Sequence, residues 1–261
     1  MKQFGNSSTF TAYGVGGCKA GWFHIAFGPA ERIRWGIEPT IDALVAKATL
    51  DDRIFIDIPI GLPSDRLGRV CDAEARNKLQ TQRLSSVLSA PVRAVLHHTN
   101  NYARANQISR ELTGKGLGKP TFNILPKIKE VNDLLGSCGK ARQIIREVHP
   151  EVCFWALAGN RPMQYKKNLL KGFFERLAVL RELWPSISET IEAIFEDDAV
   201  LKTHSRGNLD GDDILNAAAA AITAWAEPQA LRTLPEHPLK DQRGLPMEMV
   251  YVPCGTARLK H

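Results

Sequence analysis

Hydrophobic and polar positions near the start of the chain form three short runs that predict β-strands. In the third run, Ile33, Trp35 and Ile37 alternate with polar residues, as on a half-buried strand. Glycine-containing turns separate the runs, so we expect an antiparallel meander. The predicted strands are residues 12–17, 22–27 and 31–37, and a short amphipathic helix is predicted to follow from Pro39.

The next run, Arg53-Ile-Phe-Ile-Asp-Ile-Pro-Ile-Gly-Leu-Pro63, predicts a strand that is buried on both faces. Asp57 interrupts its apolar character, and a buried carboxylate needs a hydrogen bond, a proton or a cation. One interpretation is that Asp57 holds the turn that follows. The other is a binding site, because ligands of open α/β sheets gather at the carboxyl ends of strands.

Residues 64–140 are predicted to form helices and to carry the basic surplus of the chain. The stretch 64–142 holds 14 of the 34 Lys and Arg residues but only 6 of the 28 Asp and Glu residues. Such a concentration indicates either a polyanionic partner or simply solvated helix faces. The glycine-rich loop 113–120 has neither the preceding strand nor the spacing of a P-loop, so we expect a surface lid or a loop that follows a nucleic-acid strand.

A second buried strand is predicted at 141–149, with Glu147 near its carboxyl end. His149 shares the face of Glu147 and is a candidate for proton transfer, although a histidine bonded to nearby backbone is the more common case. Helices are predicted over 165–184, 187–195 and 212–225, and an edge strand over 249–253. In the last helix, Asp212 or Asp213 can share one face with Asn216.

The composition is that of a soluble globular protein, with 44% hydrophobic and 24% charged residues in 261. There is no run of ~18 apolar residues, so we expect no membrane span and a cytoplasmic location. The five cysteines are widely spaced, which argues against a disulfide framework or a zinc site. We expect a single domain over residues 1–261 with a helical insertion at about 64–140; the oligomeric state cannot be inferred.

The predicted order of elements is that of the ribonuclease H-like fold, an α/β fold with a mixed sheet of three antiparallel strands followed by parallel ones. In that fold, acidic residues from several strands and the last helix converge on magnesium or manganese, which activates water for phosphodiester hydrolysis. The candidate catalytic residues are Asp57, Glu147, Asp212 and Asp213. Asp57, Glu147 and Asp213 are the candidate metal ligands, because hard divalent cations prefer carboxylate oxygens.

The sequence also resembles an uncharacterised family of predicted ribonuclease H-like nucleases. The resemblance spans nearly the whole chain and implies a metal-dependent nuclease. It rests on seven ordered motifs, which are Gly14-Val-Gly-Gly-Cys-Lys-Ala-Gly-Trp22, Ile56-Asp-Ile-Pro-Ile-Gly-Leu62, Cys71-Asp-Ala-Glu-Ala-Arg76, Ser85-Ser-Val-Leu-Ser-Ala-Pro-Val-Arg93, Pro126-Lys-Ile-Lys-Glu-Val131, Glu147-Val-His-Pro-Glu-Val-Cys-Phe154 and Asp212-Asp-Ile-Leu-Asn-Ala217.

Two positions depart from that family. It usually has Asp where this chain has Gly16 and where it has Asn216. Losing two negative charges weakens the binding of a divalent pair. Two alternatives are therefore open, an active nuclease that uses a single metal and a catalytically inactive protein that still binds nucleic acid. A third is a nucleotide-binding, phosphotransferase-like protein that cradles phosphate with its glycine-rich first strand.

The expected partner is DNA or RNA, held by basic side chains of the insertion. Arginine pairs well with phosphate, although Arg76 and Arg93 can equally pair with Asp72 or Glu74. The candidate substrate-binding residues are Arg76, Arg93, Lys115, Lys119 and Lys127.

Overall fold

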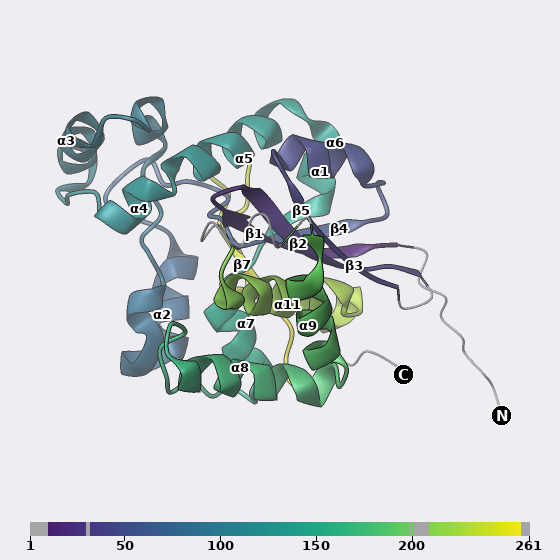
Figure 1. Ribbon diagram of the computed structural model, residues 1–261. Helices are drawn as coiled ribbons and strands as arrows, with labels where there is room; N and C mark the ends of the chain where they lie inside the picture. The colour runs from purple at the N-terminus through teal and green to yellow at the C-terminus, as the bar shows by residue number, and fades with distance from the viewer. Residues whose placement is uncertain (1–9, 30–31, 199, 201–208, 257–261) are drawn as a thin grey trace.

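The structure is a computed structural model that describes residues 10–29, 32–198, 200 and 209–256. It has a mixed α/β architecture with a five-stranded sheet flanked by helices (Figure 1). In the part of the chain described, no helix has both the length and the apolar character needed to cross a membrane.

The central sheet has the strand order β3-β2-β1-β4-β5. β1 pairs antiparallel with β2, β2 antiparallel with β3, and β1 parallel with β4, which is parallel to β5. The meander predicted for the first three strands is thus confirmed, with parallel strands added beside β1. The strands are β1 (Ala12–Cys18), β2 (Gly21–Phe27), β3 (Ile33–Glu38), β4 (Arg53–Ile56) and β5 (Ile145–Glu147).

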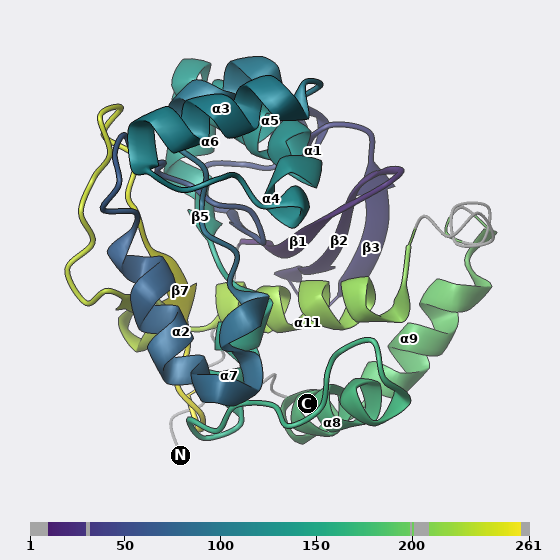
Figure 2. The same cartoon turned by 90° about the vertical axis from the view of Figure 1, so that its left-hand side faces the viewer.

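Helices cover both faces of this sheet, and each face has its own hydrophobic core (Figures 1 and 2). The helices associated with the first face are α1 (Ile41–Lys47), α3 (Tyr102–Thr113), α4 (Lys119–Asn123), α5 (Leu125–Ser137) and α6 (Gly139–Ile144). Those associated with the second face are α7 (Pro150–Leu157), α8 (Leu170–Leu183), α9 (Ile187–Glu196) and α11 (Gly211–Trp225). α2 (Val70–Arg83) packs beside α7, and short 3-10 turns lie at Leu84–Ser86, Arg93–His98 and Pro228–Ala230.

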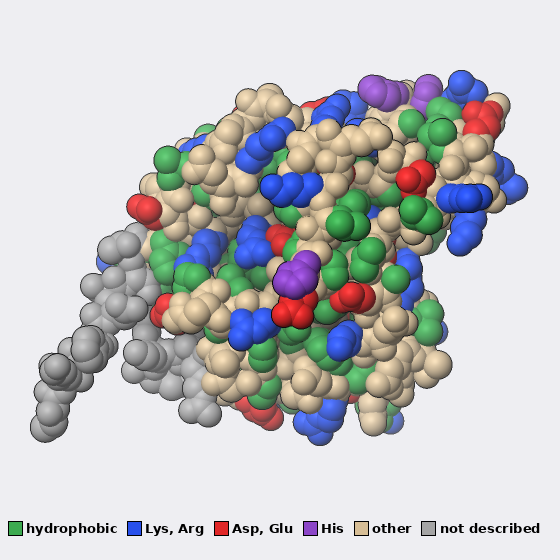
Figure 3. All heavy atoms as spheres, turned by 180° about the vertical axis from the view of Figure 1, so that it is seen from behind, with side chains coloured by type: hydrophobic (Ala, Val, Ile, Leu, Met, Phe, Trp, Pro, Cys, Tyr) green, Lys and Arg blue, Asp and Glu red, His purple; other side chains and the backbone are tan. Residues whose placement is uncertain are grey.

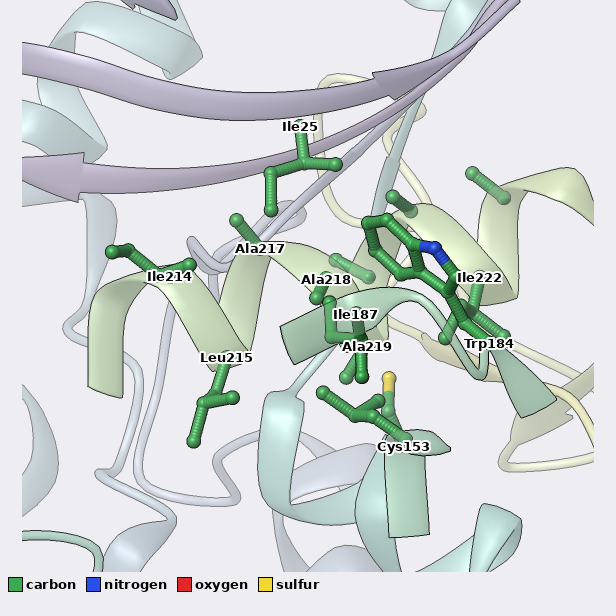
Figure 4. Close-up of a cluster of buried hydrophobic side chains, with 14 of the residues drawn as sticks. Ile25, Cys153, Trp184, Ile187, Ile214, Leu215, Ala217, Ala218, Ala219 and Ile222 are labelled. Carbon is green, nitrogen blue, oxygen red and sulfur yellow. The ribbon is translucent and has the colours of Figure 1, made fainter. Parts of the chain in front are cut away.

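Helix α11 lies unusually close to β1 because Gly14 has no side chain. A Cβ atom built at Gly14 would lie 2.1 Å from the carbonyl oxygen of Ala217 and 2.1 Å from the backbone nitrogen of Ala221. Figure 4 shows Ala217 directed toward Ile25 of the sheet, whereas Leu215 points away from it. The alanine-rich helix therefore packs directly on the backbone of β1, which fixes the position of the helix N-terminus relative to the strand ends.

Three of the predicted elements differ from the structure. The helix predicted over 165–184 begins only at Leu170, as α8. The stretch 141–149 is not one strand, because residues up to Ile144 belong to α6 and only three form β5. An apolar run of this length does not distinguish a short strand from a helix end. The predicted strand 249–253 exists as β7 (Met249–Tyr251), but it pairs with β6 (Arg232–Leu234) in a separate two-stranded sheet, and a single bridge from Val250 to Val148 joins it to the end of β5.

The helical segment between β4 and β5 divides into two parts. Helices α3 to α6 contribute to one face of the central sheet, while α2 lies at its side against α7 and β6. Lys and Arg side chains gather at the end of the molecule that α3 forms, at the upper right of Figure 3. That basic end includes the exposed residues Arg104, Arg110, Lys115 and Lys119.

Candidate functional site

A cleft with a volume of about 960 Å³ lies at the carboxyl ends of β1, β4 and β5. Residues of α4 and α5 border it on one side, and residues of α7 and α11 border it on the other. Figure 2 shows these two pairs of helices on opposite sides of the sheet. The cleft brings together Gly16, Asp57, Glu147, Asp213 and Asn216 from segments far apart in the sequence. Such a position, where parallel strands end, is the usual binding location of an open α/β sheet.

Asp57 lies at the cleft as the first residue after β4. Its backbone nitrogen donates to Val15 O at 2.9 Å, which extends the parallel ladder by one step. Phe55, two residues earlier, belongs to the core beneath α11, so alternation directs the side chain of Asp57 toward the same face. Among the described residues, no donor is hydrogen-bonded to its half-buried carboxylate. Burial raises the pKa of Asp57, while His149 and Lys167 oppose the rise and Glu151 adds to it.

Glu147 lies on the opposite face of the sheet. It pairs in register with Ile56, whose side chain belongs to the other core. Arg69 binds both oxygens of its carboxylate, at 2.7 Å from Nη1 to Oε2 and 2.8 Å from Nη2 to Oε1. The Ile60 amide donates to Oε2 as well, at 2.5 Å. Glu147 therefore borders the cleft from this opposite face, with its carboxylate paired to Arg69. Burial raises the pKa of Glu147 to about 7, and the attraction of Arg69 opposes that rise.

The same arginine also binds Asp72, so that one cation serves two buried acids. Arg69 Nη2 lies 2.6 Å from Asp72 Oδ1, and the side chains of Arg69, Asp72 and Glu147 are at most 5% exposed. Arg69 Nη1 also donates to Ile60 O at 2.9 Å. This buried network joins the start of α2 to the end of β5 and to the segment that follows β4.

Asp212 and Asp213 lie in the first turn of α11, where negative charge is favourable. Asp213 Oδ2 accepts a hydrogen bond from the Asp210 backbone nitrogen at 3.0 Å as part of a capping box. Burial raises the pKa of Asp213 to about 6, with a further contribution from Asp212 and an opposing one from Lys167. Asp213 borders the cleft, whereas Asp212 pairs with Lys167.

Lys167 provides the positive charge of this acidic group. Its ammonium lies 2.6 Å from Asp212 Oδ2. Burial lowers the pKa of Lys167, but the attraction of Asp212, Asp57 and Asp213 outweighs it, and the net shift is upward. One lysine thus interacts electrostatically with three of the four acids that the sequence singles out.

Gly16 and Asn216 both line the cleft, at the positions where the resembled family usually has acids. Gly16 is on the same face of β1 as Gly14, which contacts α11. A Cβ atom at Gly16 would meet no heavy atom within 4 Å. At position 16 the first strand therefore leaves room for a side chain and supplies none.

The predicted substrate-binding residues do not gather at one site. Arg76 is bonded to Val87 O and Ser89 Oγ, and Arg93 is bonded to Asn132 and Asp241. These two arginines connect segments of the insertion to each other and to the chain near residue 241.

The three lysines of that group also separate. Lys115 and Lys119 are exposed on the insertion and do not line the cleft, and the Lys119 ammonium lies 3.5 Å from the centroid of the Tyr102 ring. Loop 113–120 is folded back onto α3, since Leu117 is buried and its amide donates to Asn106 Oδ1 at 2.8 Å. Only Lys127 borders the cleft, where its ammonium donates to Gly21 O at 2.7 Å and lies 4.3 Å from the centroid of Trp22.

Sequence reasoning missed Glu151 and Lys167 and assigned no role to Arg69. Glu151 is in the motif Glu147-Val-His-Pro-Glu151, but a glutamate after a helix-starting proline is an ordinary first-turn residue. Lys167 lies in a short loop before α8 without any distinctive spacing. Nothing in the linear pattern placed either residue beside Asp57.

The arrangement differs from a preformed metal centre. Within the described ranges, no three His, Cys, Asp or Glu side chains lie together so as to hold a metal ion. The carboxylate of Asp57, however, has no hydrogen-bond donor among the described residues and shares the cleft with Asp213. Two such carboxylates fit a single hydrated cation. Magnesium is often bound through one or two carboxylates, with water and substrate phosphate completing the shell.

A model of the family described as "Protein of unknown function (DUF429)" matches residues 14–240. The match covers most of the chain, and the protein belongs to this family. Searches of curated proteins and of solved structures found no match.

Proposed function

We propose that this protein is a ribonuclease H-like phosphodiesterase that cleaves nucleic acid with one divalent cation at Asp57. The observation that carries the proposal is the carboxylate of Asp57, which has no hydrogen-bonded donor among the described residues and borders a cleft at the carboxyl end of β4. Magnesium or manganese held there would polarise a phosphate oxygen and lower the pKa of a bound water.

The topology supports the proposal independently of the side chains. Three antiparallel strands precede two parallel ones in the order β3-β2-β1-β4-β5, and the last long helix crosses β1. This is the arrangement expected of a ribonuclease H-like fold. It directs Asp57 and the first turn of α11, with Asp213, toward one cleft.

The lining of the cleft suits a strand of nucleic acid. Lys19, Lys127 and Lys166 border it together with Asn123 and Asn168. Cations and amides of this kind contact phosphate oxygens without reading base sequence. We therefore expect binding that depends on salt concentration and has little sequence preference.

A cleavage assay tests the proposal. Labelled single-stranded and duplex DNA and RNA are incubated with the protein in magnesium, in manganese and in a chelator, beside the variant Asp57→Asn. The exposed Asp51, close to the same strand, provides a matched control through Asp51→Asn. We expect cleavage by the wild type and by the control only with metal, and at least ~100-fold less by Asp57→Asn. Cleavage that persists in the chelator or in Asp57→Asn would refute the assignment.

A second candidate is a protein that binds nucleic acid without cleaving it. The observation that favours it is Lys167, whose ammonium already supplies a positive charge among Asp57, Asp212 and Asp213. The absence of a side chain at Gly16 points the same way. Salt-dependent binding of oligonucleotides without cleavage in any metal would support this candidate over the first. For the phosphate-cradle alternative, close packing of α11 accounts for Gly14, whereas Gly16 and Gly17 line the cleft.

A further inference from the structure

The segment 161–174 is basic and adjoins the cleft. It contains four Lys and Arg residues and no Asp or Glu. Lys166, Lys167 and Asn168 line the cleft, and the segment continues into α8, which packs against α7 and α11 on that side of the sheet (Figure 2). The side chains next to these three residues in the chain therefore lie at the edge of the cleft.

The same segment exposes hydrophobic side chains. Tyr165 is 39% exposed and Phe174 is 53% exposed, whereas every other described Phe, Tyr and Trp side chain is buried or half-buried. Leu169 and Leu170, which lie between them in the sequence, are 49% and 73% exposed. Single exposed leucines are ordinary, but exposed apolar side chains that gather with aromatic rings mark an interaction surface.

The backbone of Tyr165 is held firmly although its ring is exposed. The Glu175 carboxylate accepts from Gln164 N at 2.7 Å and from Tyr165 N at 3.0 Å. Arg176 Nη1 donates to Tyr165 O at 3.2 Å. Both backbone groups of Tyr165 are thus bonded to side chains of α8. A ring presented from a fixed backbone loses little freedom when a ligand binds to it.

A cation lies beside this ring. Lys171 Nζ is 5.5 Å from the centroid of the Tyr165 ring. Lys171 and Phe174 are three residues apart in α8, so they are neighbours on the surface of that helix. The Phe174 ring meets the Phe173 ring edge to face, with their centroids 5.7 Å apart. Lys171 thus lies next to both exposed aromatic residues.

This combination of chemistry favours one class of ligand. A single strand of nucleic acid offers phosphates to lysines and unpaired base faces to aromatic rings, whereas a duplex keeps its base faces inside the stack. A basic and apolar surface also suits an anionic membrane. Here, however, the surface continues into a cleft lined by Lys19, Lys127 and Asn123, which fits a strand better than a flat bilayer.

We propose that Tyr165 and Phe174, together with Lys166 and Lys171, form a platform that stacks the bases and binds the phosphates of a single strand leading into the cleft. The substrate class is therefore single-stranded nucleic acid. This inference rests on the proposed function, because it names the substrate of the same cleft. Stacking tolerates every base, so the platform does not select a sequence.

Fluorescence anisotropy in a chelator, where the metal-dependent reaction does not proceed, tests the inference. The probes are labelled oligothymidylate, an abasic strand of the same length and a duplex of that length. We expect the wild type to bind oligothymidylate at least ~5-fold more tightly than the other two, because one stacked base is worth ~1–3 kcal/mol. Tyr165→Ala and Phe174→Ala should each weaken oligothymidylate binding at least ~5-fold and leave abasic binding within ~2-fold.

Two variants serve as controls. Tyr165→Phe keeps the ring and should bind oligothymidylate within ~2-fold of the wild type. Leu239→Ala removes a side chain that is 59% exposed outside the segment, and it should have no effect. Thermal unfolding of each variant shows that the fold is retained.

The outcomes separate this inference from the proposed function. Wild-type affinity for oligothymidylate in both alanine variants, or equal losses on the abasic strand, overturns the platform and leaves the assignment of Asp57 standing. Binding of anionic phospholipid vesicles that the alanine variants lose, with oligonucleotide binding unchanged, assigns the surface to a membrane and also overturns it. Base-dependent binding that the alanine variants lose, without cleavage by the wild type in any metal, supports the platform and overturns the nuclease.

Discussion

The ammonium of Lys167 lies 2.6 Å from Oδ2 of Asp212, and the same ammonium interacts with Asp57 and Asp213. The positive charge of Lys167 thus balances part of the negative charge of these three acids, which would otherwise attract a metal cation from solution. The side chain of Lys167 is 50% exposed, so water screens this effect. The pair links a loop before α8 to the start of α11 at the edge of the cleft.

Removing this charge is expected to strengthen metal binding. Lys167→Gln deletes one positive charge close to the carboxylates, and we expect Mn²⁺ affinity to rise about 3- to 10-fold. Lys166→Gln changes the exposed neighbour, which also borders the cleft, and is the control. Calorimetry on both variants checks the prediction. An affinity that stays the same or falls in Lys167→Gln would show that the lysine does not compete with the cation.

Adding the two acids that the resembled family has is expected to raise both metal affinity and cleavage. A side chain at position 16 meets no heavy atom within 4 Å of its Cβ, so Gly16→Asp is sterically accommodated. Combined with Asn216→Asp it adds two negative charges to the cleft, and we expect at least ~10-fold tighter Mn²⁺ binding. The measurements are calorimetry and a cleavage rate. No gain in either would mean that the cleft does not bind divalent metal at this position.

The two strand glycines are expected to differ sharply in their tolerance of alanine. Gly14→Ala places a Cβ 2.1 Å from backbone atoms of α11, and we expect a loss of about 3 kcal/mol or more in the free energy of unfolding. Gly16→Ala meets open space and is expected to change stability by less than about 1 kcal/mol. Denaturant titration compares the two variants. Equal losses would contradict the close packing of α11 on β1.

The Arg69 network is expected to be structural. Arg69→Met leaves Glu147 and Asp72 buried without their cation, which should cost about 3–5 kcal/mol of stability. Adding Glu147→Gln removes one of the uncompensated charges, so the double variant should recover part of that loss. Urea unfolding of the single and double variants measures the coupling. Additive losses would mean that the two side chains do not interact.

Asp213 gives the stability of the fold a specific pH dependence. Its pKa of about 6 in the folded protein exceeds the ordinary value of 3.8, because burial disfavours the charged form. The folded state therefore binds this proton more tightly, and the contribution of Asp213 is full below pH ~4 and is lost as the pH rises through 6. Asp213→Asn cannot titrate and still accepts from the Asp210 amide, so it should gain stability relative to wild type between pH 4 and 7. A difference that stays constant over this range would contradict the raised pKa.

Much of the sheet can be predicted from the sequence because its first strands alternate regularly and are separated by glycine turns. Ile33, Trp35 and Ile37 mark one face of β3, and the apolar run before Asp57 marks a strand covered on both sides. The parallel strand β5 is only three residues long, and its apolar residues directly follow those of α6. The local sequence pattern alone therefore does not define it.

The sequence predicts where the site lies better than it predicts which residues line it. Asp57, after the end of β4, and Asp213, in the first turn of α11, line the same cleft. The sequence pattern groups Glu147 with these acids because it also ends a strand. Side chains alternate between the two faces of a sheet, however, and Glu147 is on the face opposite to Asp57, where Arg69 binds it. Glu151, four residues later, reaches the cleft from a helix, and that depends on how α7 packs under α11.

The most direct test of the central claim is a single-turnover cleavage rate on a labelled oligonucleotide in saturating Mn²⁺, compared between wild type and Asp57→Asn. The account predicts a rate at least ~100-fold lower in Asp57→Asn, with both proteins unfolding at similar temperatures. Equal rates would contradict the claim that Asp57 is the centre of the site.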